Sequence, residues 1–102
     1  MNEVIGQVVI SKAGRDAGRA FVIVAVADDA HVLLSDGDLR GLARPKRKKL
    51  RHIKPTGVYI GEFGNMLSSG GLNDAEVRRL LKQYGFAKTH AQGEMDVETR
   101  CN

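Results

Sequence analysis

The stretch Gly6-Gln-Val-Val-Ile-Ser-Lys-Ala-Gly-Arg-Asp-Ala-Gly-Arg-Ala-Phe-Val-Ile-Val24 decides the fold of this 102-residue chain. It contains two apolar, β-branched runs, and a polar segment rich in glycine lies between them. β-Branched residues favour strands, whereas Gly and Asp favour turns. The pattern therefore predicts a strand, a tight turn and a second strand, with Gly14, Asp16 and Gly18 as the turn-forming residues.

Further short strands are expected after this stretch. The run Phe21–Val26 is followed by Asp28 and Asp29 and then by residues 31–35, a pattern typical of a β-hairpin. Residues 36–38, Asp-Gly-Asp, supply another turn, in which Gly37 accepts positive φ at low cost. Several short strands without crossover helices predict a mainly β fold, either a small barrel or a strongly bent sheet around one main core.

The positive charge of the chain is concentrated in its first half. Lys and Arg number 16 against 12 Asp and Glu, and residues 1–56 carry 11 of the cations and 6 of the acids, while residues 57–102 carry 5 and 6. The segment Arg44–Lys54 holds seven cations and no acid. A polyanion such as RNA relieves the repulsion within such a cluster and releases its own counterions on binding. The alternative interpretation is a solvated charged face or a localisation signal.

A second group of cations, Lys12, Arg15 and Arg19, surrounds the first turn. If the barrel places this turn beside residues 44–54, one side of the domain would be strongly basic. Leu50 and Ile53 are the large apolar residues of the basic segment, so its second part is expected to be a half-buried strand with the cations outside. His52 is expected either to contact nucleic acid or to be an exposed strand residue without a role.

The second half predicts one amphipathic helix over about residues 74–84. Asn73 can cap it and Glu76 completes a capping box. Residues 58–63 are either a last strand or an apolar segment packed on the barrel, and residues 64–71 are expected to be a loop. The expected helix has a single apolar stripe that either packs on the parent domain or docks a protein partner, and the stripe consists of Val77, Leu80, Leu81 and Tyr84.

The composition disfavours several other classes of protein. No apolar run approaches the ~20 residues of a membrane span, and residues 1–10 do not resemble a secretory signal. The single cysteine, Cys101, indicates a reducing compartment, so we expect a cytoplasmic protein. The histidines and Cys101 lack metal-site spacing, no cofactor motif is present, and no arrangement of residues suggests catalysis.

The residues around the first turn resemble the KOW motif, a β-turn-β element of several ribosomal proteins and of NusG-type elongation factors. The match includes the characteristic glycine at Gly18, and it extends over residues 4–56 through Asp36–Arg40 and Pro45–His52. Together these segments are similar to a KOW-type large-subunit ribosomal protein of archaea and eukaryotes. The resemblance implies an SH3-like barrel that binds RNA, in particular ribosomal RNA, through the turn and the basic strand.

Twelve residues are candidate RNA contacts: the resemblance assigns eleven lysines and arginines, and His52 is the additional candidate named above. They are Lys12, Arg15, Arg19, Arg40, Arg44, Lys46, Arg47, Lys48, Lys49, Arg51, His52 and Lys54.

We therefore predict a non-enzymatic, monomeric RNA-binding protein that associates with the ribosome or with structured RNA. The alternative is a protein-interaction adaptor of the transcription or translation machinery. The expected organisation is a basic barrel over residues 1–56, a loop and helix over 57–87 packed on or beside it, and a flexible tail over 88–102.

Overall fold

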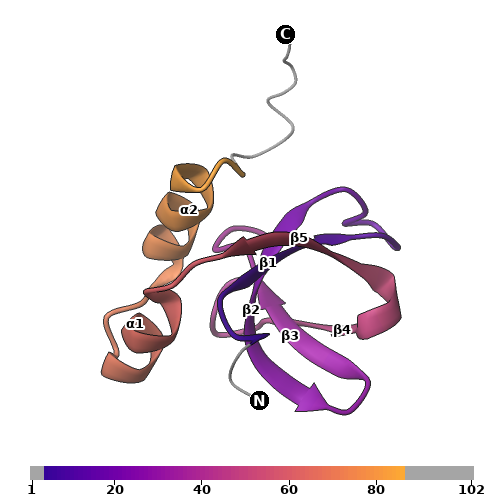
Figure 1. Ribbon diagram of the computed structural model, residues 1–102, viewed down its shortest axis with the longest axis horizontal. Helices are drawn as coiled ribbons and strands as arrows, with labels where there is room; N and C mark the ends of the chain where they lie inside the picture. The colour runs from indigo at the N-terminus through magenta and orange to yellow at the C-terminus, as the bar shows by residue number, and fades with distance from the viewer. Residues whose placement is uncertain (1–3, 87–102) are drawn as a thin grey trace, which may run out of the picture.

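The computed structural model describes residues 4–86, which form a five-stranded sheet followed by two helices (Figure 1). The prediction of a mainly β fold is confirmed. The tail expected at residues 88–102 lies outside the described residues. In chain order the elements are β1 (Gln7–Ser11), β2 (Ala20–Asp28), β3 (His31–Ser35), β4 (Lys46–Lys49), the 3₁₀-helix η2 (Leu50–His52), β5 (Ile53–Tyr59), α1 (Phe63–Ser69) and α2 (Asp74–Gln83).

The sheet closes on itself as a small barrel. Its strand order is β4-β3-β2-β1-β5, and all the neighbouring strands are antiparallel. β4 and β5 therefore lie at the two opposite edges of the sheet, yet only the three residues of η2 join them. A single 3₁₀ turn spans only about 6 Å, so the sheet must curl until its edges almost meet. This is the SH3-like barrel that the sequence predicted, followed by a helical extension.

β2 is buried on both faces, which explains its unbroken apolar run. Phe21 and Ile23 point into the barrel, where they pack in a cluster with Val9, Val32, Leu34 and Ile53. Val22 and Val24 point to the other face and pack under the helices. Alternate residues of a strand face opposite sides, so a strand covered on both sides must be apolar throughout. The single main core expected from the sequence is thus two clusters separated by the sheet.

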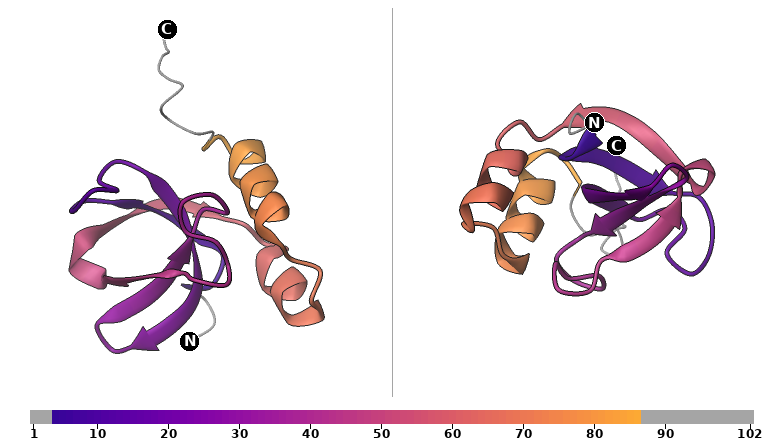
Figure 2. Two further views of the ribbon diagram at one scale, coloured as in Figure 1. Left: turned by 180° about the vertical axis from the view of Figure 1, so that it is seen from behind. Right: turned by 90° about the horizontal axis from the view of Figure 1, so that it is seen from below.

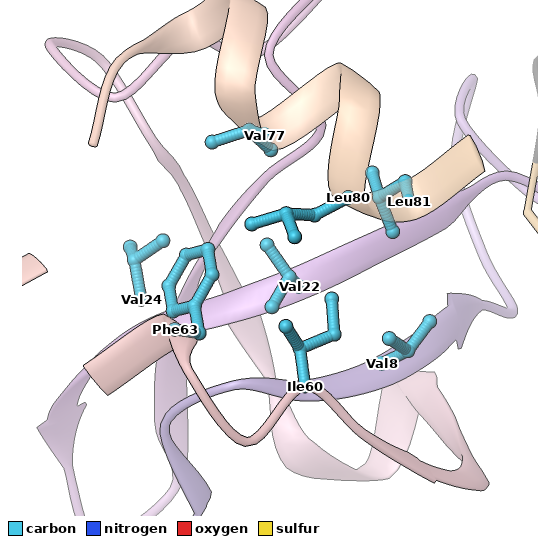
Figure 3. Close-up of a cluster of buried hydrophobic side chains, with 8 residues drawn as sticks. All are labelled: Val8, Val22, Val24, Ile60, Phe63, Val77, Leu80 and Leu81. Carbon is cyan, nitrogen blue, oxygen red and sulfur yellow. The ribbon is translucent and has the colours of Figure 1, made fainter. Parts of the chain in front are cut away.

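The two helices cover one side of the barrel and leave the β4–η2 corner at the opposite end (Figures 1 and 2). The predicted helix is α2, and the Asn73 side chain caps it by accepting a hydrogen bond of 2.9 Å from the backbone N–H of Glu76. Val77 and Leu80 are fully buried and Leu81 is 4% exposed, packed on Val8 and Val22 as Figure 3 shows. Val77, Leu80 and Leu81 are therefore covered by the chain's own barrel, and Tyr84 packs half-buried at the edge of the cluster, so the stripe packs on the parent domain.

The expected loop over residues 64–71 instead contains a second helix, α1. Its glycines and serines are typical of a loop, but Phe63 at its start is fully buried in the cluster beneath α2. Gly70 ends the helix in a left-handed conformation with a φ of 80°. Tertiary packing of one aromatic residue thus outweighs weak helix propensity.

The apolar segment 58–63 combines the two alternatives that the sequence left open. β5 continues to Tyr59, so the boundary expected at residue 56 falls within that strand. Ile60 and Phe63 then leave the sheet and pack in the cluster under the helices. Neither helix in the described part of the chain is long and apolar enough to cross a membrane.

Candidate functional site

The barrel places the first turn beside the basic segment, as the sequence predicted. The backbone N–H of Lys12 donates a hydrogen bond of 2.8 Å to the carbonyl of His52. In the adjoining ladder Ser11 pairs with Ile53, and Ile10 pairs with Lys54. Two segments separated by some thirty residues in the sequence therefore form one continuous surface at the β4–η2 corner.

The turn itself is held by backbone hydrogen bonds. The N–H of Gly18 donates to the carbonyl of Ser11 at 2.8 Å, and the N–H of Ser11 donates to the carbonyl of Arg19 at 3.0 Å. Gly14 and Gly18 have φ values of 82° and 88°, which glycine adopts without steric cost. The tight loop leaves the side chains of Lys12 and Arg15 exposed to solvent.

Lys48 does not lie on the surface, although the sequence predicted an exposed strand of cations. Its side chain is only 7% exposed, and its ammonium donates hydrogen bonds of 2.8 Å to both the carboxylate of Asp16 and the carbonyl of Ala13. The register explains the error, because Lys48 pairs with Val32, whose side chain is part of the barrel interior. The lysine stem therefore runs through the barrel and its ammonium emerges at the first turn.

Asp16 is held in its charged form by this arrangement. Burial alone would favour the neutral acid, but hydrogen bonds from Lys48 and from the Ser11 hydroxyl, both 2.8 Å long, keep the pKa of Asp16 below its usual range. The Ser11 side chain is itself buried. Turn and strand are thus joined by a small network of buried polar groups.

Arg19 is the second predicted RNA contact whose charge is already compensated. Its guanidinium lies 2.9 Å from the buried carboxylate of Asp36 and 3.8 Å from that of Asp38. The Asp36 carboxylate also accepts backbone hydrogen bonds from Asp38 and Arg40, so it shapes the loop as well as pairing with Arg19. Arg19 therefore links the first turn to the loop that begins at residue 36.

The loop over residues 36–44 is braced by α2. The N–H of Leu42 donates to the Asp74 carboxylate at 2.8 Å, and Arg78 donates to the carbonyl of Gly37. Gly37 has a φ of 73°, and a Cβ built there would lie 2.4 Å from the carbonyl of Asp74, so no larger residue fits. Two predicted contact residues, Arg40 and Arg44, are exposed on this loop.

A shallow pocket of about 290 Å³ lies at the basic corner, where β3 and β4 meet η2. Asp28 anchors one side of it, because one carboxylate oxygen accepts from Nδ1 of His31 at 2.9 Å and the other pairs with Arg47. The hydrogen bond from His31 is the main reason that the pKa of Asp28 lies well below its usual range. All six residues that line the pocket are basic or imidazole side chains: His31, Lys46, Arg47, Lys48, Lys49 and His52.

His52 lies in a field of positive charge. Partial burial, and then the charges of Arg51 and Lys49, hold the pKa of His52 below its ordinary value. Lys48 and Lys12 add to the effect from neighbouring elements. The neutral imidazole is therefore favoured, and an anion placed beside it would favour the protonated form instead.

Asp28 and His31 belong to the site but were not singled out from the sequence. The signal was the hairpin itself, because a strand at residues 31–35 that pairs with the basic strand places His31 opposite Lys49. Among residues 4–86, no group of three His, Cys, Asp or Glu side chains is placed to hold a metal ion.

Comparison with known proteins gives a consistent set of relatives. No family model matches the chain. The chain is 38% identical over 84 residues to the large ribosomal subunit protein eL14 of Pyrobaculum arsenaticum, covering 82% of this chain and 76% of the relative. It is 34% identical over 85 residues to eL14 of Staphylothermus marinus, covering 82% and 81% of the two chains. For eL14 of Saccharolobus islandicus the identity is 31%, with the same coverage.

Proposed function

This chain belongs to the eL14 family of large ribosomal subunit proteins, and on that premise we propose that it is a non-enzymatic protein that binds structured ribosomal RNA. One observation carries the proposal: the fold brings the first turn and the cation-rich segment 44–54 together at the corner opposite the helices. The whole segment contains no acid. Such a surface attracts a polyanion over any neutral or cationic partner.

The chemistry of binding would be neutralisation of phosphates. Arginine guanidinium groups form planar, paired hydrogen bonds to phosphate oxygens, and lysine ammonium groups act as point charges. Phe21, the one aromatic residue among residues 1–56, is fully buried in the barrel and is not available to stack on bases. Phosphate contacts should therefore supply most of the affinity. The exposed cations of the turn and corner that we assign to this role are Lys12, Arg15, Arg47, Lys49, Arg51 and Lys54, together with the half-buried Lys46.

Lys48 and Arg19 are not in this set, because Asp16 and Asp36 hold their charges in pairs that are largely buried, whereas Arg47 is 58% exposed in its pair with Asp28. Arg40 and Arg44 would form a separate contact on the loop that α2 braces. The adaptor alternative loses one of its two docking faces, since Val77, Leu80 and Leu81 of the α2 stripe are buried against the barrel. We propose that the protein is a monomer, because the exposed large apolar side chains of the described residues are spread over different elements and loops and form no single patch. We also propose that it acts on ribosomes in the cytoplasm.

The salt dependence of RNA binding tests this assignment. The full chain is needed, because a cut at residue 56 would remove the end of β5 and the buried Ile60 and Phe63. With five to seven phosphate contacts, the logarithm of the affinity for a ribosomal RNA fragment should fall by about 0.7–0.9 times that number per decade of salt. A salt-independent affinity would overturn the phosphate-contact model.

A matched pair of double variants locates the contacts. Lys49→Ala with Arg51→Ala removes two exposed cations from the corner, and Arg79→Ala with Lys82→Ala removes two from α2. The corner variant should reduce the salt slope by about 1.4–1.8, because a complex with two fewer phosphate contacts releases fewer counterions when it forms. The α2 variant should leave the slope unchanged. Equal reductions in the two variants would show that the contacts are not confined to the corner.

A further inference from the structure

The loop between β3 and β4, residues 36–44, is shaped by its own hydrogen bonds. The carbonyl of Arg40 accepts a hydrogen bond of 3.1 Å from the N–H of Asp36, and the Asp36 carboxylate accepts one of 2.9 Å from the N–H of Arg40 in return. Further along, the N–H of Arg44 donates to the carbonyl of Gly41 at 3.1 Å. The loop thus consists of two consecutive turns, and each ends in an exposed arginine.

α2 fixes the position of this loop on the barrel. The Asp74 carboxylate accepts a hydrogen bond of 2.8 Å from the N–H of Leu42, whose half-buried side chain packs on the cluster under the helices. A Cβ built at Gly41 would lie 2.7 Å from the same carboxylate, so the loop backbone lies directly against it. One turn further along the helix, Arg78 donates to the carbonyl of Gly37. The N-terminal end of α2 therefore holds both turns of the loop.

The two arginines of the loop can bind a phosphate. Both Arg40 and Arg44 are exposed, and the ion pairs formed within residues 4–86 engage neither of them. Paired hydrogen bonds from a guanidinium to a phosphate require accurate placement of the backbone that carries it. A loop that is already ordered also loses less conformational entropy on binding. The loop should therefore bind RNA more tightly when α2 holds it than when it is released.

We propose that α2 positions the 36–44 loop for RNA binding, with Asp74 and Arg78 as positioning residues that act through Arg40 and Arg44. The inference rests on the proposed function and deepens it, because it gives the helical extension a part in binding the phosphate backbone. The extension then has two roles. Its apolar stripe covers the outer face of the sheet, and its N-terminal end orders a loop that meets the RNA.

Removal of the Asp74 carboxylate distinguishes positioning from a simple effect of charge. Asp74→Ala takes a negative charge from a surface that binds a polyanion, so charge alone predicts tighter binding. Loss of the hydrogen bond to Leu42 releases the loop, so positioning predicts affinity about two- to fivefold weaker. Asp74→Asn keeps an oxygen that can accept from Leu42 and should retain at least the parent affinity. Binding by Asp74→Ala as tight as that of the parent, or tighter, would overturn the proposal.

A double-mutant cycle shows whether the loss passes through the loop arginines. The probe is the fragment of large-subunit ribosomal RNA that the full-length parent protein protects from nuclease. The loss caused by Asp74→Ala should shrink to less than about 1.5-fold when Arg40→Ala and Arg44→Ala are already present. It should persist in full when Lys49→Ala and Arg51→Ala, at the corner, are present instead. An equal loss in the two backgrounds would show a merely structural role for Asp74 and overturn the proposal.

A control variant and a direct measurement on the loop complete the test. Glu76→Ala is the matched control, because Glu76 lies in the same first turn of α2 but pairs with Arg79 instead of the loop. Its RNA affinity should stay within about 1.5-fold of the parent value. By NMR, the amide proton of Leu42 should exchange with solvent faster in Asp74→Ala than in the parent or in Asp74→Asn. Equal losses of affinity in Glu76→Ala and Asp74→Ala, or unchanged exchange at Leu42, would overturn the proposal.

The salt dependence separates this inference from the proposed function. Arg40→Ala with Arg44→Ala should reduce the salt slope by about 1.4–1.8, the loss of two phosphate contacts. An unchanged slope in that variant would overturn the role of the loop and leave the phosphate contacts of the corner standing. A flat salt response of the parent protein would instead overturn the proposed function itself.

Discussion

The cluster under the helices and the β4–η2 corner lie at opposite ends of the barrel, and different forces stabilise them (Figures 1 and 3). Under the helices, Val22, Phe63 and Leu80 are fully buried and packed on one another. At the corner the side chains are charged, and those that are buried are held by ion pairs such as Lys48 with Asp16. The comparison indicates that one end supports the fold and the other is left free to bind.

The adjacent residues Lys48 and Lys49 show that this division is made residue by residue. Lys48 is buried and paired with Asp16, whereas Lys49 is exposed. They have the same chemistry and lie on one strand, but the alternation of the strand sends their side chains to opposite faces. A basic segment is therefore not a uniform binding surface, and its charge overstates the number of phosphates it can contact.

The largest expected effect comes from the helical end. Leu80→Ala removes a fully buried side chain and should lower the free energy of unfolding by about 3 kcal/mol, through lost burial and the cavity left behind. Urea denaturation followed by circular dichroism measures it. RNA affinity, measured where the variant is still folded, should change less than about twofold, well under 1 kcal/mol.

The neighbouring exposed residue supplies the control. Arg79→Ala removes a surface pair with Glu76 and should cost about 0.5 kcal/mol or less. If Leu80→Ala were as mild as Arg79→Ala, or if it abolished RNA binding in the folded protein, the separation of the two ends would be wrong.

The next effect compares Lys48 with Lys49. Lys48→Met keeps the apolar stem but leaves the Asp16 carboxylate without its partner, so it should cost about 2 kcal/mol of stability, whereas Lys49→Met should cost little. Because Lys48 keeps the pKa of Asp16 low, its contribution is complete above pH 4 or so and is lost as pH falls through the lowered pKa. Denaturation at a series of pH values measures this loss.

RNA binding should reverse the order of the two variants. Lys49→Met should reduce the salt slope by about 0.7–0.9, the loss of one phosphate contact, while Lys48→Met should leave the slope unchanged in the folded protein. A smaller slope in Lys48→Met than in Lys49→Met would show that the buried lysine reaches the RNA after all.

The smallest effect concerns pH and His52. Burial and the charges of Arg51 and Lys49 hold the pKa of His52 below its ordinary value, and RNA phosphates should raise it again on binding. The complex then binds more protons than the free protein, so affinity should increase about two- to fivefold as pH falls from 8 to 5.5. Binding titrations of the parent and of His52→Ala across this range measure it, and an equal pH dependence in both would exclude His52 as its source.

The parts of the fold that follow from local sequence were predictable. The turn at residues 12–18, the strand after it and the capped helix α2 each depend on spacing within a short window. The position of α1 was not predictable from its glycines and serines, because the helix depends on a buried contact of Phe63 with distant strands. An element could be predicted where the contacts that form it lie close together in the sequence, and could not where they involve distant residues.

The candidate site follows the same rule. The clustering of cations is visible in the sequence, and the juxtaposition of the turn with the basic segment follows from a closed barrel. The burial of Lys48 and the pairing of Arg19 depend on strand register and on a loop contact, which composition does not contain. The pocket likewise required the pairing of β3 with β4, which brings His31 to the basic strand.

The pairing of β1 with β5 also affects how the chain folds as it is synthesised. Gln7 pairs with Tyr59, which comes 52 positions later in the chain, and Val8 is covered by residues that come later still. Until that segment emerges, β1 has one unpaired edge and the outer face of the sheet is apolar and bare. Long-range pairings of this kind close slowly, because the loop entropy is lost before the contacts form. We therefore expect the barrel to assemble late and as a unit with α2, so that the basic β4–η2 corner is completed only when the helical end is in place.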